Sequence, residues 1–212
     1  MQQQKRRSLF LLITSGYLIL STAGAALFGV LSDRGAFSGW GFFRMFTTDS
    51  NVLMGLAAIP VFGLALASLC GWQGKMPRWL VRFYLVAATS VALTFLTVMV
   101  LFVPFMGVFA FMQDNFFFHL LNPLVAMASC VWLVQPHRLT VADCFIATVP
   151  MVIYGSVYVP CVLTGRWIDF YNFTFGGHFE LAPLMCAVMY GATFLCAFIL
   201  KVGHNAVLKR ER

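Results

Sequence analysis

Charged residues are so widely spaced along this chain that they divide it into six long uncharged stretches. Only 10% of the 212 residues are charged, whereas 61% are hydrophobic. Soluble domains carry about 25% charged residues. A helix that crosses a bilayer needs roughly 20 consecutive apolar residues, and each stretch can hold one. The stretches lie between Arg7 and Asp33, Asp49 and Lys75, Arg82 and Asp114, Asp114 and Arg138, Asp143 and Arg166, and Glu180 and Lys201.

This spacing predicts an all-α polytopic membrane protein with six transmembrane helices, built as a single integral membrane domain over residues 1–212. We expect the helices at about 9–31, 48–69, 83–105, 116–134, 144–163 and 181–201, with outer segments near 32–47, 106–115 and 164–180. The first apolar run follows a basic segment and contains Ala23-Gly24-Ala25, as a cleaved signal peptide would. Because it continues to Leu31, it is too long for a typical signal sequence, and we expect an uncleaved helix.

The distribution of basic residues predicts the orientation. With the N-terminus in the cytoplasm, the inner segments hold Lys5, Arg6, Arg7, Lys75, Arg78, Arg82, Arg138, Lys201, Lys209, Arg210 and Arg212, and only Arg34, Arg44 and Arg166 face outward. Cytoplasmic segments of membrane proteins carry such an excess of Lys and Arg. Both termini are therefore expected in the cytoplasm, in a bacterial cytoplasmic membrane. The net charge of +7 indicates membrane lipids with anionic headgroups as partners, and no nucleic acid.

The cysteines and histidines predict no metal and no cofactor. The cysteines show no CxxC or metal-ligand spacing, and free cysteine is a common small buried residue. They are Cys70, Cys130, Cys144, Cys161, Cys186 and Cys196. The two outer histidines, His119 and His178, have no ligand spacing either.

Polar residues able to do chemistry gather in three outer segments. The second helix opens with Phe46-Thr47-Thr48-Asp49-Ser50-Asn51, the fourth begins with His119-Leu-Leu-Asn122-Pro123, and the last outer loop contains Asp169. His119 lies about one turn inside an apolar run, where ionisable groups are rare and usually functional, and Asn122 shares its helix face. We therefore expect any chemistry at the outer membrane face.

Each of these segments also has a purely structural interpretation. His119 can be hydrogen-bonded to a neighbouring helix at the membrane interface. Ser, Thr, Asp and Asn are preferred helix N-caps, although one cap needs only one of the five polar residues 47–51. The aromatic residues of 167–178 suit a belt at the headgroup level. These alternatives remain open at the level of sequence.

The first two segments resemble a known pattern. Phe46–Asn51 looks like the F-T-x-x-S-N motif of a large group of uncharacterised bacterial six-helix integral membrane proteins, and His119 with Pro123 matches that group's H-x-x-x-P motif. The group distantly resembles the androgen-induced and androgen-dependent membrane hydrolases, which cleave fatty acid esters of hydroxy fatty acids with an intramembrane threonine and a histidine. The resemblance implies Thr47 as nucleophile, Thr48 as the alternative in a shifted register, and His119 as the base.

The implied chemistry is lipid-ester hydrolysis at the outer face. A threonine hydroxyl becomes nucleophilic when a base removes its proton, and the second helix's N-terminus or Asn122 can stabilise the oxyanion. Asp49 or Asp169 can hold the imidazole tautomer, and Asn51 belongs to the same motif. The alternative is a small-molecule transporter or binding protein without catalysis, although only hydroxyl groups such as those of Ser90 and Thr94 are expected near the midplane.

Overall fold

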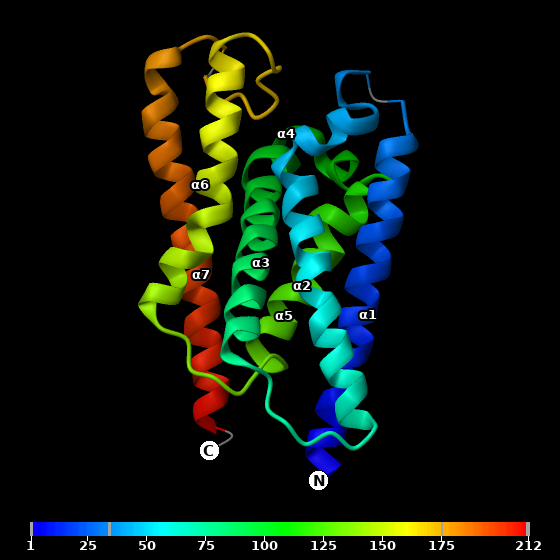
Figure 1. The fold of residues 1–212 in the computed structure, drawn as a ribbon. Coiled ribbons are helices and arrows are strands. Elements are labelled where there is room, and N and C mark those ends of the chain that lie inside the picture. The colour runs from blue at the N-terminus through cyan, green and yellow to red at the C-terminus, as the bar shows by residue number, and fades with distance from the viewer. Residues whose placement is uncertain (1, 34, 175, 211–212) are drawn as a thin grey trace.

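The computed structural model describes residues 2–33, 35–174 and 176–210, and within them every regular element is a helix. The long helices run side by side along one axis (Figure 1). They are α1 (Gln2–Leu31), α2 (Phe46–Leu69), α3 (Arg78–Thr97), α5 (Asn122–Trp132), α6 (Val141–Leu163) and α7 (Ala182–Arg210). Short pieces join them: 3-10 turns η1 (Gly35–Phe37), η2 (Gly39–Arg44), η4 (Gly107–Phe111) and η6 (Phe179–Leu181), π turns η3 (Val98–Phe102) and η5 (Phe116–Leu121), and α4 (Val103–Met106).

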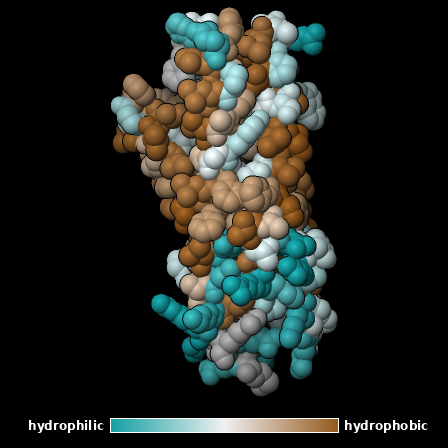
Figure 2. Space-filling model, turned by 90° about the vertical axis from the view of Figure 1, so that its left-hand side faces the viewer, coloured by the Kyte–Doolittle hydropathy of each residue, from teal (hydrophilic) through white to brown (hydrophobic). Residues whose placement is uncertain are grey.

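The bundle has the surface of a helical membrane protein. Among the described residues, five helical segments are long and apolar enough to cross a bilayer, and Phe116–Trp132 is a shorter apolar one. Large apolar side chains such as Leu20, Ile153 and Ile199 point outward from the middle of their helices. The α6–α7 side is hydrophobic over its middle, and hydrophilic residues gather at its lower end (Figure 2). Such a surface is stable in lipid and not in water.

Helix α3 is the centre of the bundle. It packs against α2, α5, α6 and α7, and nearly all of its residues from Leu80 to Thr94 are buried. Small side chains on α3 let neighbouring backbones approach closely, as is common where helices pack in membranes. They are Ala87, Ala88, Thr89, Ser90, Ala92 and Thr94.

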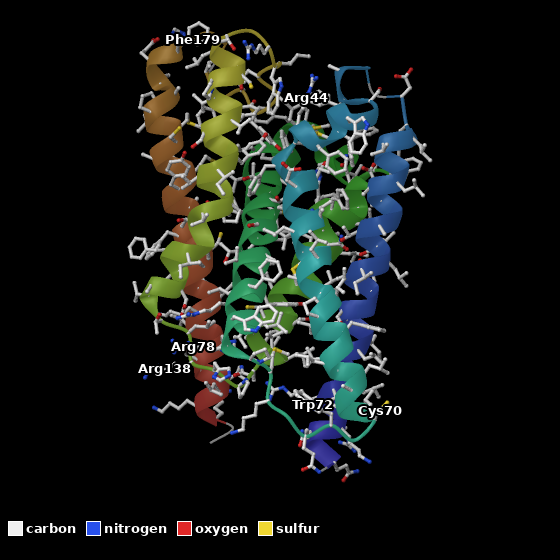
Figure 3. All side chains as sticks on the ribbon, in the orientation of Figure 1. Arg44, Cys70, Trp72, Arg78, Arg138 and Phe179 are labelled. Carbon is white, nitrogen blue, oxygen red and sulfur yellow. The ribbon has the colours of Figure 1, made fainter. Side chains whose placement is uncertain are left out.

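Both chain ends lie at the same end of the bundle (Figure 1). Arg78, Arg138 and the 70–77 segment lie at that end, and Arg44 lies at the opposite one (Figure 3). We call them the terminal end and the far end. Arg34 and Arg212, two of the basic residues from which the orientation is predicted, lie outside the described residues. The remaining placement matches the expected division of basic residues between the two ends.

The third helix differs from the expected 83–105. It begins at Arg78, and after Thr97 it passes through the π turn η3, the short α4 and the 3-10 turn η4. Pro104 lacks a backbone N–H and its ring crowds the preceding turn, so the regular series of α-helical hydrogen bonds cannot continue. Gly107 then takes a φ of 55°, which reverses the chain at the far end.

The fourth helix, expected at 116–134, consists of the π turn η5 followed by α5. The last helix, expected at 181–201, runs from Ala182 to Arg210. The expected end was wrong because Lys201 was taken as the limit of the helix. A charged residue limits the apolar span but does not end a helix, and here the Lys201 ammonium lies over the Phe198 ring within the same helix.

Side chains from two other helices satisfy the carbonyls at the end of α5. Arg7 of α1 donates from Nε to the Leu133 oxygen at 2.9 Å and from Nη2 to the Trp132 oxygen at 3.2 Å. His204 of α7 bonds the Cys130 oxygen through Nδ1 at 2.8 Å. The last carbonyls of a helix have no partner within it, so these contacts both cap α5 and tie three helices together.

The start of α6 is fixed by a capping box and an ion pair. The Asp143 carboxylate accepts from the Thr140 backbone N–H and hydroxyl, both at 2.8 Å, and the Asp143 N–H donates back to the Thr140 hydroxyl. The other carboxylate oxygen lies 2.6 Å from Arg82 Nε on α3. One buried carboxylate therefore caps α6 and joins it to the central helix.

We expect Asp143→Ala to lower the free energy of unfolding by about 2 kcal/mol, because it removes the cap and leaves Arg82 without its carboxylate. Thr140→Ala keeps the ion pair and should cost about 1 kcal/mol. Denaturant unfolding in detergent, followed by circular dichroism, measures both. Wild-type stability in Asp143→Ala would contradict this account of the α6 start.

Candidate active site

A cavity of about 260 Å³ opens at the far end of the bundle between α2, the 98–121 segment and the outer loops. Thr47 and Thr48 reach it from the first turn of α2, and His119 reaches it from η5. Aromatic rings form much of the remaining wall, among them Phe42 and Phe118. The structure thus brings the three sequence-predicted catalytic residues to one cavity. Among the described residues, no hydrogen bond joins either threonine side chain to His119, and the cavity lies between them.

His119 is held by a backbone carbonyl. Its side chain is buried, and Nδ1 lies 2.7 Å from the oxygen of Ala110 in η4. A carbonyl oxygen can only accept, so Nδ1 carries the proton and Nε2 of the neutral ring keeps its lone pair. We expected Asp49 or Asp169 to hold the imidazole tautomer. That was wrong for Nδ1, because the broken segment after α3 places the Ala110 carbonyl there.

The H-x-x-x-P motif explains the local backbone around His119. In the π turn, the Asn122 N–H bonds the Phe117 oxygen five residues earlier. The next bond in this register would run from residue 123 to the Phe118 oxygen, but Pro123 has no N–H. The Phe118 oxygen accepts instead from the side-chain amide of Asn51, at 3.2 Å. The two sequence motifs are therefore joined by a hydrogen bond.

Asn51 and Asn122 form a buried amide pair at the centre of three helices. Asn122 Nδ2 donates to Asn51 Oδ1 at 3.0 Å, and Asn122 Oδ1 accepts from the Ser21 hydroxyl of α1 at 2.7 Å. Asn51 Nδ2 also donates to the Thr47 carbonyl at 2.8 Å. Asn122 was one of the two groups predicted to be able to stabilise the oxyanion, but its amide is fully buried and bonded to Asn51 and Ser21, which leaves the α2 N-terminus as the other candidate. Both amides position the site and do not line it.

The polar residues that open α2 do not act as its N-cap. The N-cap is Met45, and it makes no side-chain capping bond. The Ser50 hydroxyl instead bonds the Thr94 hydroxyl on α3, at 2.9 Å. The capping interpretation of this run is thus wrong. The cluster is polar because it joins neighbouring helices and supplies hydroxyls to the cavity.

A second cavity distinguishes Thr47 from Thr48. It is a narrow space of about 40 Å³ between α2, α3, α6, α7 and the last outer loop, and its walls are almost entirely apolar. Thr47 lines both cavities, whereas Thr48 lines only the first. The Thr47 side chain is 9% exposed and Thr48 is 0% exposed. Thr47 is therefore the hydroxyl that a ligand can reach from either side.

Tyr171 is a residue near Thr47 that sequence reasoning missed. Its hydroxyl is buried without a well-formed hydrogen bond. The polar groups around it include the Thr47 side chain and the backbone of Phe46 and Thr47, at the α2 N-terminus. Burial raises the pKa of the Tyr171 phenol above its ordinary value, although these hydrogen-bonding neighbours act in the opposite direction. The phenol thus stays protonated beside the proposed nucleophile.

Asp169 positions the loop that carries Tyr171. Its carboxylate accepts from the Tyr158 hydroxyl and the Phe173 N–H, at 2.9 and 2.7 Å, and from the Thr174 N–H and hydroxyl, both at 2.8 Å. The Tyr158 oxygen in turn accepts from the Tyr171 N–H at 3.2 Å. Asp169 is therefore a structural centre of the loop.

Asp49 lies half-buried in the first turn of α2 and lines neither cavity. In the part of the chain that the structure describes, no three His, Cys, Asp or Glu side chains gather where they could hold a metal ion. The polar groups that do line the larger cavity are hydroxyls, an amide and one imidazole, which suit acid–base and nucleophilic chemistry.

Comparison with known proteins leaves the chemistry to be argued from this geometry. No family model matches the chain, and no curated protein or solved structure matches it. The resemblance of the F-T-x-x-S-N and H-x-x-x-P motifs to the six-helix hydrolases therefore stays a prediction.

The outer loop should depend on pH through Asp169. Burial alone raises the pKa of this carboxyl, but the hydrogen bonds that it accepts outweigh burial and bring its pKa below the ordinary value. A lowered pKa in the folded state adds stability above the unfolded value of about 3.9, and that stability is lost as the pH falls through the folded value. Hydrogen exchange of the Phe173 and Thr174 amides should therefore accelerate in acid, after correction for intrinsic rates. In Asp169→Asn, protection should be low at every pH; protection equal to wild type would contradict this role.

Proposed function

We propose that this protein is a membrane-embedded hydrolase of lipid esters, with Thr47 as nucleophile and His119 as general base. The observation that supports this most is the shared cavity, together with the bond from His119 Nδ1 to the Ala110 oxygen. That bond leaves Nε2 as the basic nitrogen. A positioned hydroxyl, an imidazole of fixed tautomer and space for a substrate are what nucleophilic ester cleavage requires.

The reaction follows the usual steps of acyl transfer. The Thr47 oxygen attacks the ester carbonyl carbon while His119 Nε2 takes the hydroxyl proton. The tetrahedral intermediate then expels the alcohol, which receives that proton, and an acyl ester of Thr47 remains. Water attacks this ester, with its proton again passing to Nε2, and the fatty acid leaves as Thr47 is restored.

In the proposed mechanism, the oxyanion of the intermediate lies at the α2 N-terminus. The Thr48 and Asp49 N–H groups both bond the Met45 carbonyl, so those of Phe46 and Thr47 lie outside this helical ladder. Together with the neighbouring Tyr171 hydroxyl they offer donors beside the Thr47 oxygen. Donors of this kind stabilise developing negative charge, and a helix N-terminus favours it further.

The cavity walls favour an ester with long hydrocarbon chains. The narrow cavity beside Thr47 is lined by apolar residues such as Val98, Leu101 and Met189. The wider cavity is walled mainly by phenylalanines. A substrate with its ester at Thr47 can place hydrocarbon in the wide cavity of about 260 Å³, whereas the narrow one, of about 40 Å³, has room for only the first carbons of a chain. The proposed substrates are thus fatty acid esters drawn from the membrane, as the resemblance also implies.

Activity-based labelling tests this proposal. We expect a fluorophosphonate probe to label the wild-type protein in membranes, and Thr47→Ala or His119→Ala to reduce labelling by at least about 100-fold, because each removes one partner of the reaction. Thr47→Ser supplies an equivalent hydroxyl and should retain labelling, and Thr48→Val is the matched control. Full labelling of Thr47→Ala would exclude it as the nucleophile.

We also propose that the chain crosses the membrane six times, with both termini in the cytoplasm of a bacterial cell. The five long apolar segments and the shorter Phe116–Trp132 supply the six crossings. Two features support the orientation: the chain ends share one end of the bundle (Figure 1), and most basic residues are expected there. The cavity of Thr47 and His119 then faces away from the cytoplasm.

Cys70 provides a direct test of orientation, because it is an exposed free cysteine in the segment between α2 and α3. We expect a membrane-impermeant maleimide to leave Cys70 unmodified in intact cells and to label it after permeabilisation. Trp40→Cys in a Cys70→Ser background should behave in the opposite way, since Trp40 is 85% exposed near the far end. The reversed pattern would invert the proposed topology.

A further inference from the structure

The largest of the cavities described lies at the terminal end of the bundle, away from Thr47 and His119. Its volume is about 340 Å³, which falls within the usual range of small-molecule sites. The first turns of α1, the last turns of α2, the 72–76 segment and residues 133–136 form its walls. The proposed hydrolase does not use it.

The cavity has an apolar part and a polar part. Leu11, Leu64 and Leu133 belong to the apolar part, and Arg7 and Lys75 bring two basic side chains to the polar part. The residues described as lining it include no Asp or Glu. A cavity with this division fits a ligand that is anionic at one end and hydrocarbon at the other.

The two cations have complementary properties. The bonds from Arg7 to the Trp132 and Leu133 carbonyls hold its side chain against the cavity wall. Lys75 lies exposed in the 70–77 segment, so its flexible ammonium can close over a bound anion.

Contacts between the surrounding segments hold the cavity wall together. The Ser8 and Ser68 hydroxyls bond each other at 2.8 Å and join α1 to α2 in its wall. The Trp72 indole folds back against Gly74, where any side-chain Cβ would overlap the ring. Trp is favoured where lipid headgroups meet water, and here it lines the cavity beside Lys75.

We propose that this cavity binds the headgroup of an anionic phospholipid, with the phosphate between Arg7 and Lys75. A phospholipid fits better than a soluble anion because the polar part adjoins apolar walls and lipid-facing helices. Leu9 and Phe10 of α1 and Leu66 of α2 are exposed nearby in the sequence and can contact the acyl chains. Basic pockets between membrane helices at the cytoplasmic face bind such headgroups.

The test is lipid-dependent thermal stability of the full-length protein in detergent. Short-chain phosphatidylglycerol should raise the unfolding temperature of the wild type, whereas phosphatidylcholine of the same chain length and inorganic phosphate should not. Lys75→Gln should raise the half-saturating concentration of phosphatidylglycerol about fivefold, because it removes one basic side chain. Arg78→Gln is the matched control, since Arg78 is exposed at the same end but does not line the cavity.

Three outcomes would overturn the proposal: equal weakening in Lys75→Gln and Arg78→Gln, which indicates diffuse surface attraction; equal stabilisation by phosphatidylcholine; or equal stabilisation by inorganic phosphate, which indicates a soluble ligand. Arg7→Gln should weaken lipid binding as well, but it also removes part of the α5 cap. Lys75→Gln is therefore the variant that tests the lipid site. Native mass spectrometry of the same variants should show bound phosphatidylglycerol in the wild type and Arg78→Gln, and less in Lys75→Gln.

Discussion

The Phe118 carbonyl has no backbone N–H to accept from in its own helix, because Pro123 occupies the position that would donate. Lipid offers no water to replace that bond, and an unpaired polar group in the bilayer costs several kcal/mol. Asn51 supplies the missing donor from α2 and is itself held by Asn122. This contact joins α2 to the π turn that carries His119, so it helps to hold Thr47 and His119 on the same cavity.

The same break in regular structure orients the proposed base. An uninterrupted helix over 98–121 would carry its backbone carbonyls along the helix axis and leave none for a neighbouring imidazole. The turn at Gly107 instead brings the Ala110 oxygen to Nδ1 of His119. On the other side of Thr47, Asp169 organises the loop that carries Tyr171. Two irregular segments thus position the residues on either side of the proposed nucleophile, and the regular helices hold these segments in place.

The membrane class and the approximate helix positions could be predicted because charges are rare in this chain. The same reasoning placed the starts of two helices too late along the chain. Arg82 and Asp143 were treated as limits of the helices, although both lie within helices and pair with each other. Residue type and motif singled out Thr47, Thr48 and His119, and the structure brings these three residues to one cavity. The role of Ala110 was not predictable, because a backbone carbonyl leaves no signal in the sequence. Tyr171 could not be predicted, because the sequence contains many aromatic residues. Only the path of the loop in the structure shows that Tyr171 lies beside Thr47.

In the proposed six-span topology, the fourth crossing is shorter than the bilayer that it spans. Phe116–Trp132 contains 17 residues, which extend at most about 25 Å, whereas the hydrocarbon core of a bilayer is about 30 Å thick. The carbonyls where α5 ends already accept hydrogen bonds from Arg7, so this end of the helix does not depend on water for partners. In that topology the bilayer beside α5 would be thinned locally, while the longer neighbouring helices span its full thickness.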